Sequence, residues 1–151
     1  MTLKSVSDGD KPVGVIGAGN FGTVVANLLA RQRKVLLYAR DEQAVQRIHE
    51  TRENRGHPIH DNVVPTNDLS SLAQQCDVIF PIVPSSHFRL MMKQLSPHIH
   101  PYHILIHGTK GFDVKLPPGQ TIDMMPTLDR SMVKTISEVI QEESVAVRVG
   151  C

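Results

Sequence analysis

The chain of 151 residues is poor in several residue types, and each shortage excludes a class of protein. It has no tryptophan and only 4% aromatic residues, so a platform for stacking single-stranded nucleic acid is not expected. Two cysteines, Cys76 and Cys151, are too few for a disulfide framework and favour a reducing, cytoplasmic compartment. The net charge of +1 gives no field that would attract nucleic acid or an anionic membrane. No apolar run reaches the roughly 20 residues that a membrane span needs.

Short apolar runs alternate with segments of helical periodicity along most of the chain. Residues 1–11 are polar and predict a flexible tail, whereas residues 12–151 suffice for one domain. Continuous apolar runs are typical of parallel strands buried on both faces. Their alternation with helices predicts an α/β fold with a doubly wound parallel sheet of about six strands between two helical layers, the Rossmann arrangement. We expect strands within residues 12–17, 34–39, 63–64, 77–83, 102–107 and 145–149, and helices within 20–31, 41–51, 68–73, 85–95 and 131–142.

A glycine motif follows the first expected strand and opens the first expected helix. Gly17, Gly19 and Gly22 form the pattern GxGxxG. The first glycine allows a tight turn, the second lets a diphosphate approach the backbone, and the third lets the helix pack close to the strand. The free amides of the first helical turn then face the phosphates. The motif therefore predicts a site for NAD or NADP, with Phe21 in the turn, where its ring can reach the cofactor.

Arg40 and Asp41 follow the second expected strand. NAD enzymes usually place an acid there, about 20 residues after the glycine motif, to bind the ribose hydroxyls. A guanidinium at Arg40 can instead pair with a 2′-phosphate or lie over the adenine. Asp41 can simply cap the next helix. The pair favours acceptance of NADP without excluding NAD, and a solvated charge at a strand end is the simpler alternative for Arg40.

Two further loops follow strands in the second half of the chain. Pro84 ends the fourth expected strand and borders the nicotinamide side of the predicted crevice. Lys110 stands between Gly108 and Gly111 after the fifth expected strand, where its ammonium can reach into the crevice. An exposed loop lysine is the alternative interpretation of Lys110.

These segments resemble the glycerol-3-phosphate dehydrogenases that use NAD or NADP. The resemblance implies reversible reduction of dihydroxyacetone phosphate to sn-glycerol 3-phosphate by hydride transfer, in glycerophospholipid synthesis. It implies that Asn20 and Phe21 contact the cofactor and that Arg40 contacts its adenosine end. Lys110 would stand between the cofactor and a small phosphorylated substrate. The motifs that carry it are GAGNFGTVVANLLA at residues 17–30, YARD at 38–41, IVPSSHF at 82–88 and GTKGF at 108–112.

The resemblance also implies a second domain. Members of the family continue into a helical domain that supplies the catalytic lysine and most substrate contacts. We therefore expect no catalytic residue within these 151 residues, and cofactor binding with little turnover by this segment alone. A homodimer of the full-length protein is compatible with this. The chain departs from the family pattern at residues 55–61, to which we assign no function.

Other functions stay open on the residues alone. A dehydrogenase of a 2-keto or 3-hydroxy acid would begin with a similar domain, and so would a non-catalytic module that senses NAD(H). Five of the eight histidines lie between His87 and His107. We do not expect a metal site, because zinc needs a converging set of ligands and no cysteine accompanies these histidines.

Overall fold

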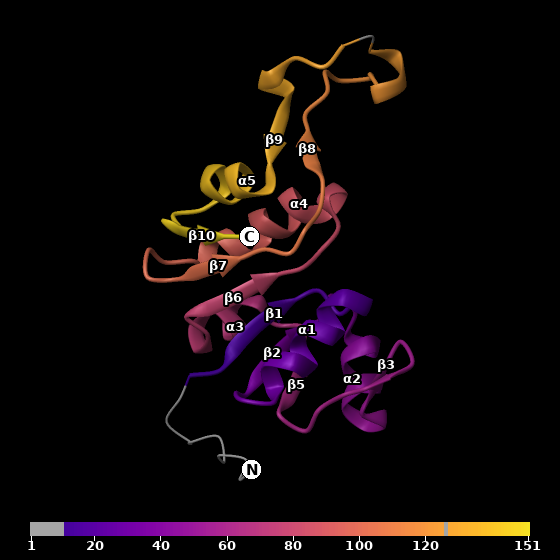
Figure 1. Cartoon of the computed structure of the whole chain (residues 1–151), viewed down its shortest axis with the longest axis vertical. Helices are drawn as coiled ribbons and strands as arrows, with labels where there is room; N and C mark the ends of the chain where they lie inside the picture. The colour runs from indigo at the N-terminus through magenta and orange to yellow at the C-terminus, as the bar shows by residue number, and fades with distance from the viewer. Residues whose placement is uncertain (1–10, 126) are drawn as a thin grey trace.

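The computed structural model describes residues 11–125 and 127–151 as a parallel sheet with helices on both faces (Figure 1). The predicted tail falls outside the described residues except for Lys11. The sheet strands are β1 (Val13–Ile16), β2 (Val35–Tyr38), β5 (Val63–Thr66), β6 (Val78–Pro81), β7 (Ile104–Ile106) and β10 (Arg148–Gly150). The helices are α1 (Asn20–Ala30), α2 (Glu42–Thr51), α3 (Leu69–Gln75), α4 (Ser85–Leu95) and α5 (Ile136–Glu143).

The strand order confirms the predicted doubly wound α/β fold. Within the described residues, the sheet runs β10-β7-β6-β1-β2-β5, and all neighbouring strands are parallel. From β1 the chain first builds outward through β2 to β5, and then returns to the other side of β1 with β6. In such sheets, ligands bind at the carboxyl ends of the strands where the order reverses. That point lies between β1 and β6.

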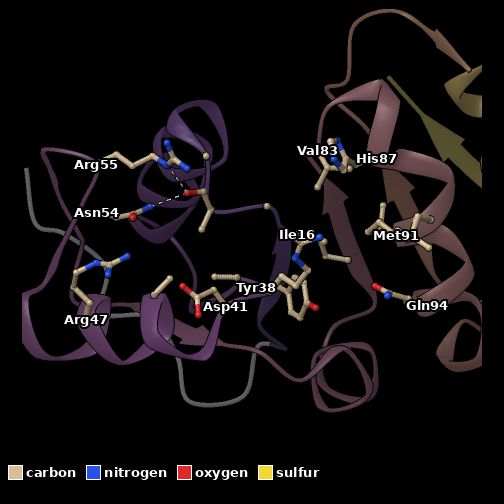
Figure 2. A pocket seen from close by; sticks show the side chains of 17 residues that line it. Ile16, Tyr38, Asp41, Arg47, Asn54, Arg55, Val83, His87, Met91 and Gln94 are labelled. Atoms are coloured by element: carbon tan, nitrogen blue, oxygen red, sulfur yellow. Dashed lines mark hydrogen bonds between the residues drawn. The ribbon is translucent and has the colours of Figure 1, made fainter.

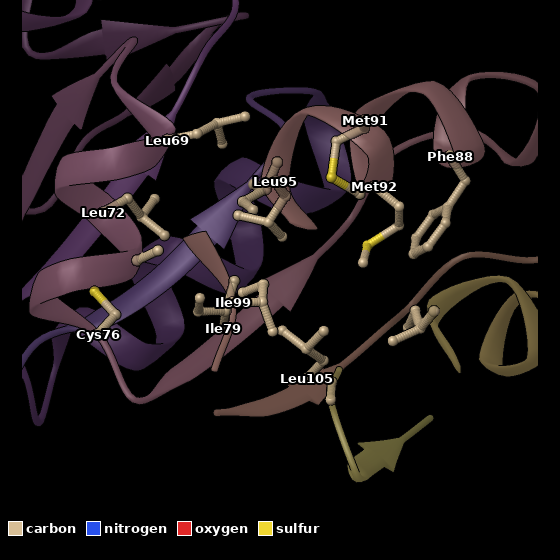
Figure 3. Packing of buried hydrophobic residues seen from close by; sticks show 14 of the residues in the cluster. Leu69, Leu72, Cys76, Ile79, Phe88, Met91, Met92, Leu95, Ile99 and Leu105 are labelled. Atoms are coloured by element: carbon tan, nitrogen blue, oxygen red, sulfur yellow. The ribbon is translucent and has the colours of Figure 1, made fainter. Parts of the chain in front are cut away.

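Two hydrophobic layers hold the helices on the sheet. Val15 and Leu37 are fully buried in the layer that contains residues of α1 and α2. Their chain neighbours Ile16 and Leu36 face the other layer, which contains residues of α3, α4 and α5 (Figure 3). Each large aliphatic side chain that is buried contributes about 1.5–3 kcal/mol. Burial on both faces explains why the strands read as continuous apolar runs.

Side-chain caps begin three of the helices, but not α1. Asp41 caps α2, as one interpretation of the sequence predicted, and Asp68 caps α3. Thr135 and Glu138 form a reciprocal capping box at the start of α5. The N-cap of α1 is Gly19, which has no side chain to occupy the first amides. Those amides are therefore left for another partner.

Two small antiparallel pairs were not predicted, and one expected helix was partly wrong. Residues 131–142 are not one helix, because residues 133–135 form a strand before α5 begins. That strand pairs with a segment about 20 residues earlier, which local periodicity cannot reveal. The last strand covers 148–150 rather than 145–149. The pairs are β3 (Glu53–Asn54) with β4 (His57–Pro58), and β8 (Phe112–Val114) with β9 (Val133–Thr135). Short 3₁₀ turns are η1 (Ser96–His98), η2 (Ile122–Met124) and η3 (Arg130–Met132).

A network of charges joins α4 to α5 and to the β8–β9 pair. The Arg89 guanidinium, only 14% exposed, contacts the carboxylates of Asp113, Glu142 and Glu143. The Lys134 ammonium lies 3.1 Å from a Glu142 carboxylate oxygen. Together with Arg89 it lowers the pKa of Glu142 to about 2. The network fixes α4, whose first turn borders the crevice.

In the part of the chain that the structure describes, no helix combines the length and apolar character needed to cross a membrane. The Cys76 side chain lies in the hydrophobic layer of α3 and α4, where burial raises the pKa of its thiol to about 12. A buried thiol with so high a pKa is unreactive near neutral pH.

Candidate functional site: a crevice at the glycine turn

Three loops meet at the carboxyl ends of the central strands. The Phe21 ring, from the first turn of α1, lies against Gly108, so a β-carbon there would be 2.8 Å from Phe21 Cε1. The Thr109 hydroxyl, in the loop after β7, donates to the Val83 carbonyl at 2.7 Å. Gly111 follows with φ +103° and approaches Ser85. The loops that the sequence singled out separately therefore form one surface.

The three glycines of the motif have different steric surroundings. Gly17 has φ +116°, and a β-carbon there would lie 2.1 Å from the Ile82 carbonyl oxygen. A β-carbon on Gly22 would lie 1.8 Å from the Gly17 carbonyl oxygen. Both positions need glycine for the fold itself. Gly19 has no neighbour within 4 Å of such a β-carbon and an ordinary extended backbone with φ −75°. Open space at Gly19 therefore leaves room for a ligand rather than for packing.

Hydrogen bonds from the β3–β4 hairpin hold the carbonyl groups of the glycine turn. The buried Asn54 amide donates to the Ala18 carbonyl at 2.9 Å and to the Thr23 hydroxyl at 2.8 Å. The Thr23 hydroxyl in turn donates to the Gly19 carbonyl at 2.7 Å. No side chain caps the first amides of α1, and its N-cap Gly19 lines the cavity. This arrangement suits an anion.

A cavity of about 630 Å³ opens beside this turn (Figure 2). Its volume falls within the range of small-molecule and cofactor sites. Arg47, Asn54 and Arg55 lie on one side, and Val83 and His87 lie across from them (Figure 2). The lining residues are Ile16, Gly17, Ala18, Gly19, Tyr38, Ala39, Arg40, Asp41, Ala44, Arg47, Asn54, Arg55, Val83, His87, Leu90, Met91 and Gln94.

The structure brings some of the predicted site residues to the cavity and places others around it. Gly17, Gly19 and Arg40 line the cavity. Gly22 is buried in α1, next to the Gly17 carbonyl. The remaining predicted residues do not line it and are exposed at the same edge of the sheet: Asn20 and Phe21 in the first turn of α1, and Pro84 and Lys110 on loops. Their contacts with a cofactor or substrate stay predictions.

Sequence reasoning missed the hairpin residues, because it assigned no function to residues 55–61 and did not single out Asn54. Asn54 and Arg55 both donate to the Ala18 carbonyl inside the glycine motif. The available signal was Gly56, which completes a two-residue hairpin turn. It was weak because the paired strands are only two residues long.

His107 ends the run of histidines after β7 and is buried close to this edge of the sheet. Burial lowers the pKa of its imidazole, so the ring is neutral near pH 7. Its Nε2 lies 3.0 Å from the Ser137 hydroxyl. Across the described residues, no three histidine, cysteine or acidic side chains are grouped closely enough to hold a metal ion.

The family model and the curated relatives that match this chain point to the same family. The family model described as "NAD-dependent glycerol-3-phosphate dehydrogenase N-terminus" matches residues 12–150. A glycerol-3-phosphate dehydrogenase [NAD(P)+] of Saccharophagus degradans is 41% identical over 106 residues, which cover 67% of this chain and 30% of the relative. One from Teredinibacter turnerae is 31% identical over 143 residues, covering 91% of this chain and 37% of the relative.

A solved structure agrees in fold. Glycerol-3-phosphate dehydrogenase from Coxiella burnetii superposes with a TM-score of 0.69 at 24% identity, covering 92% of this chain and 38% of that one. The chain spans about a third of the length of the curated relatives it matches. Since the family model covers nearly all described residues, the chain belongs to the family of NAD-dependent glycerol-3-phosphate dehydrogenase N-terminal domains.

Proposed function

We propose that residues 12–151 form the cofactor-binding domain of a glycerol-3-phosphate dehydrogenase and bind NAD or NADP in the crevice at the glycine turn. The observation that carries this proposal is the open position of Gly19 at the start of an α1 that has no side-chain cap. A diphosphate placed there would meet backbone amides and the positive end of the helix. A side chain at Gly19 would fill the same space.

The other predicted residues have distinct roles in this proposal. Asn20 and Phe21 contact the cofactor from the first turn of α1, Pro84 contacts it from the second loop, and Arg40 contacts its adenosine end. Lys110 extends from the third loop to hold the phosphate of the substrate. The nicotinamide supplies hydride transfer when bound. The chain itself binds and orients the cofactor and limits access of water.

The activity of the whole protein is supported by its family. We propose interconversion of dihydroxyacetone phosphate and sn-glycerol 3-phosphate in glycerophospholipid synthesis, in the cytoplasm. A further helical domain would supply the catalytic lysine, and the full-length protein would form a homodimer. This chain alone is then expected to bind dinucleotide but to turn over little substrate.

Titration of the chain with NADPH and NADH, followed by an assay of dihydroxyacetone phosphate reduction, tests the proposal. We expect saturable binding and little turnover. In the full-length enzyme, Lys110→Ala should weaken substrate use and change cofactor affinity little, with Lys115→Ala, just after β8, as the control. Absence of binding to either nucleotide rejects the site, and a Lys110→Ala enzyme with normal substrate use rejects the role of Lys110.

A further inference from the structure

The loop between β7 and β8 carries Lys110 on its exposed side. Among residues 11–125 and 127–151, no carboxylate forms an ion pair with the Lys110 ammonium. The place of that ammonium therefore depends on how the backbone of the loop is held. On the near side, the Thr109 hydroxyl donates to the Val83 carbonyl at 2.7 Å. Gly111, with φ +103°, lies against Ser85 at the start of α4.

Asp113 holds the far side of this loop. It lies in β8, just after the loop, and its side chain is only 14% exposed. Arg89 Nε donates to Asp113 Oδ2 at 2.9 Å, and Arg89 Nη2 lies 2.8 Å from the same oxygen (Figure 1 shows β8 beside α4). Arg89 stands about one helical turn after Ser85 on α4. The guanidinium therefore ties the strand that follows the loop to the helix against which the loop packs.

The Arg89 guanidinium has two further partners, and neither belongs to the loop. It donates to the carboxylate of Glu142 at 2.9 Å and to that of Glu143, and both residues lie in α5. These two carboxylates suffice to join α4 to α5, whereas Asp113 extends the tie to the loop. Because the guanidinium is only 14% exposed, its charge-assisted hydrogen bonds are little screened by solvent. Asp113 is thus the partner that relates the position of α4 to that of the loop.

We propose that Arg89 and Asp113 are positioning residues: their ion pair fixes the backbone of residues 109–111, and thereby the place from which Lys110 reaches the phosphate of the substrate. The inference rests on the proposed function, because it takes Lys110 to hold that phosphate. Arg89 and Asp113 lie outside the lining of the cavity and act through the loop. A lysine on a fixed backbone has less freedom to lose when it binds a phosphate. A misplacement of about 1 Å can cost as much as about a hundredfold in rate.

The experiment compares Asp113→Ala with Glu143→Ala in the full-length enzyme. Each variant removes one carboxylate from the same guanidinium, but only Asp113 belongs to the strand that follows the loop. We expect Asp113→Ala to lower kcat/KM for dihydroxyacetone phosphate about tenfold, chiefly by raising KM, and to leave the dissociation constant of the dinucleotide within about twofold. Glu143→Ala should leave both quantities within about twofold. Asp113→Asn keeps an oxygen that can accept from Arg89 and should recover part of the loss.

A double-mutant cycle tests whether the effect passes through Lys110. In an enzyme that already carries Lys110→Ala, no ammonium is left to position. Asp113→Ala should then change kcat/KM for dihydroxyacetone phosphate by less than about twofold, so the two substitutions are far from additive. A carboxylate that only stabilises the fold would instead lower kcat/KM by the same factor in both backgrounds.

Backbone dynamics of the 151-residue chain test the anchoring of the loop without any substrate. NMR order parameters of the amides at residues 109–111 should lie near about 0.85 in the wild-type chain and in Glu143→Ala. In Asp113→Ala they should fall toward about 0.6. A thermal melt of each variant checks folding, and if Asp113→Ala does not fold, Asp113→Asn takes its place in every comparison.

The outcomes distinguish this proposal from the proposed function. Normal substrate use by the Lys110→Ala enzyme rejects the role of Lys110 itself. If Lys110→Ala is impaired while Asp113→Ala and Glu143→Ala behave alike, the positioning role of the ion pair is rejected and the role of Lys110 stands. Losses that simply multiply in the double variant, or order parameters at residues 109–111 that Asp113→Ala leaves unchanged, reject the positioning role in the same way.

Discussion

Substitution of Gly19 by alanine separates ligand binding from folding. The new β-carbon would meet no atom within 4 Å, and the backbone at φ −75° is ordinary for alanine. Alanine is a poorer N-cap than glycine, but it also reduces the entropy of the unfolded chain by about 0.4–1 kcal/mol. The two effects oppose each other, so we expect the free energy of unfolding to change by about 0.5 kcal/mol or less, and the melting temperature by about 2 °C or less.

The same methyl group would stand where the diphosphate approaches the amides of α1. Loss of two charge-assisted hydrogen bonds, at about 1.5 kcal/mol each, corresponds to about a hundredfold weaker dinucleotide binding. Calorimetric titration and a thermal melt of Gly19→Ala measure both quantities. Gly22→Ala is the contrasting variant, because its β-carbon would lie 1.8 Å from a backbone oxygen and should destabilise the fold by 1–3 kcal/mol or more. Normal affinity in a folded Gly19→Ala chain would refute the assignment of the diphosphate.

Three further predictions concern the scaffold around the crevice. Arg89→Ala should lower the free energy of unfolding in urea by about 3 kcal/mol, because three carboxylates lose a largely buried partner; a change below about 1 kcal/mol would contradict this. Lys134 and Arg89 lower the pKa of Glu142 to about 2, so its stabilising contribution is complete above pH 4.5 and is lost as pH falls toward 2. The free energy of unfolding, measured from pH 6 to 2.5, should therefore fall less steeply for Glu142→Gln than for the wild type. Iodoacetamide at pH 8 should label Cys151 in the native chain and spare Cys76, whose thiol is buried with its pKa raised to about 12; rapid labelling of both would show that this core opens readily.

Periodicity in the sequence predicted the layers of this fold because parallel strands buried on both faces are continuous in apolar residues. It also predicted the glycine turn, since the fold requires Gly17 and Gly22 whatever the cavity binds. The β8–β9 pair could not be predicted, because residues 133–135 become a strand only through pairing with a segment about 20 residues earlier. Long-range pairing of this kind leaves no local pattern.

Only part of the candidate site could be predicted, because some of its residues reach the cavity only through long-range folding. Arg40 was found because it directly follows a buried strand, and its position at the sheet edge follows from the fold. Arg47 and Arg55 reach the cavity only after α2 and the hairpin fold back over the glycine turn. Asn54 gives no signal in the sequence, because its importance comes from hydrogen bonds to Ala18 and Thr23, which lie more than 30 residues earlier.

The most direct measurement is an NMR titration of the isotope-labelled chain with NADPH, following each backbone amide. The account predicts that the largest shifts fall on residues 19–22, with smaller shifts at the hairpin, and that they saturate together with one dissociation constant. Shifts confined to another face of the molecule, or a spectrum unchanged at millimolar nucleotide, would contradict the claim that the amides opening α1 receive a dinucleotide.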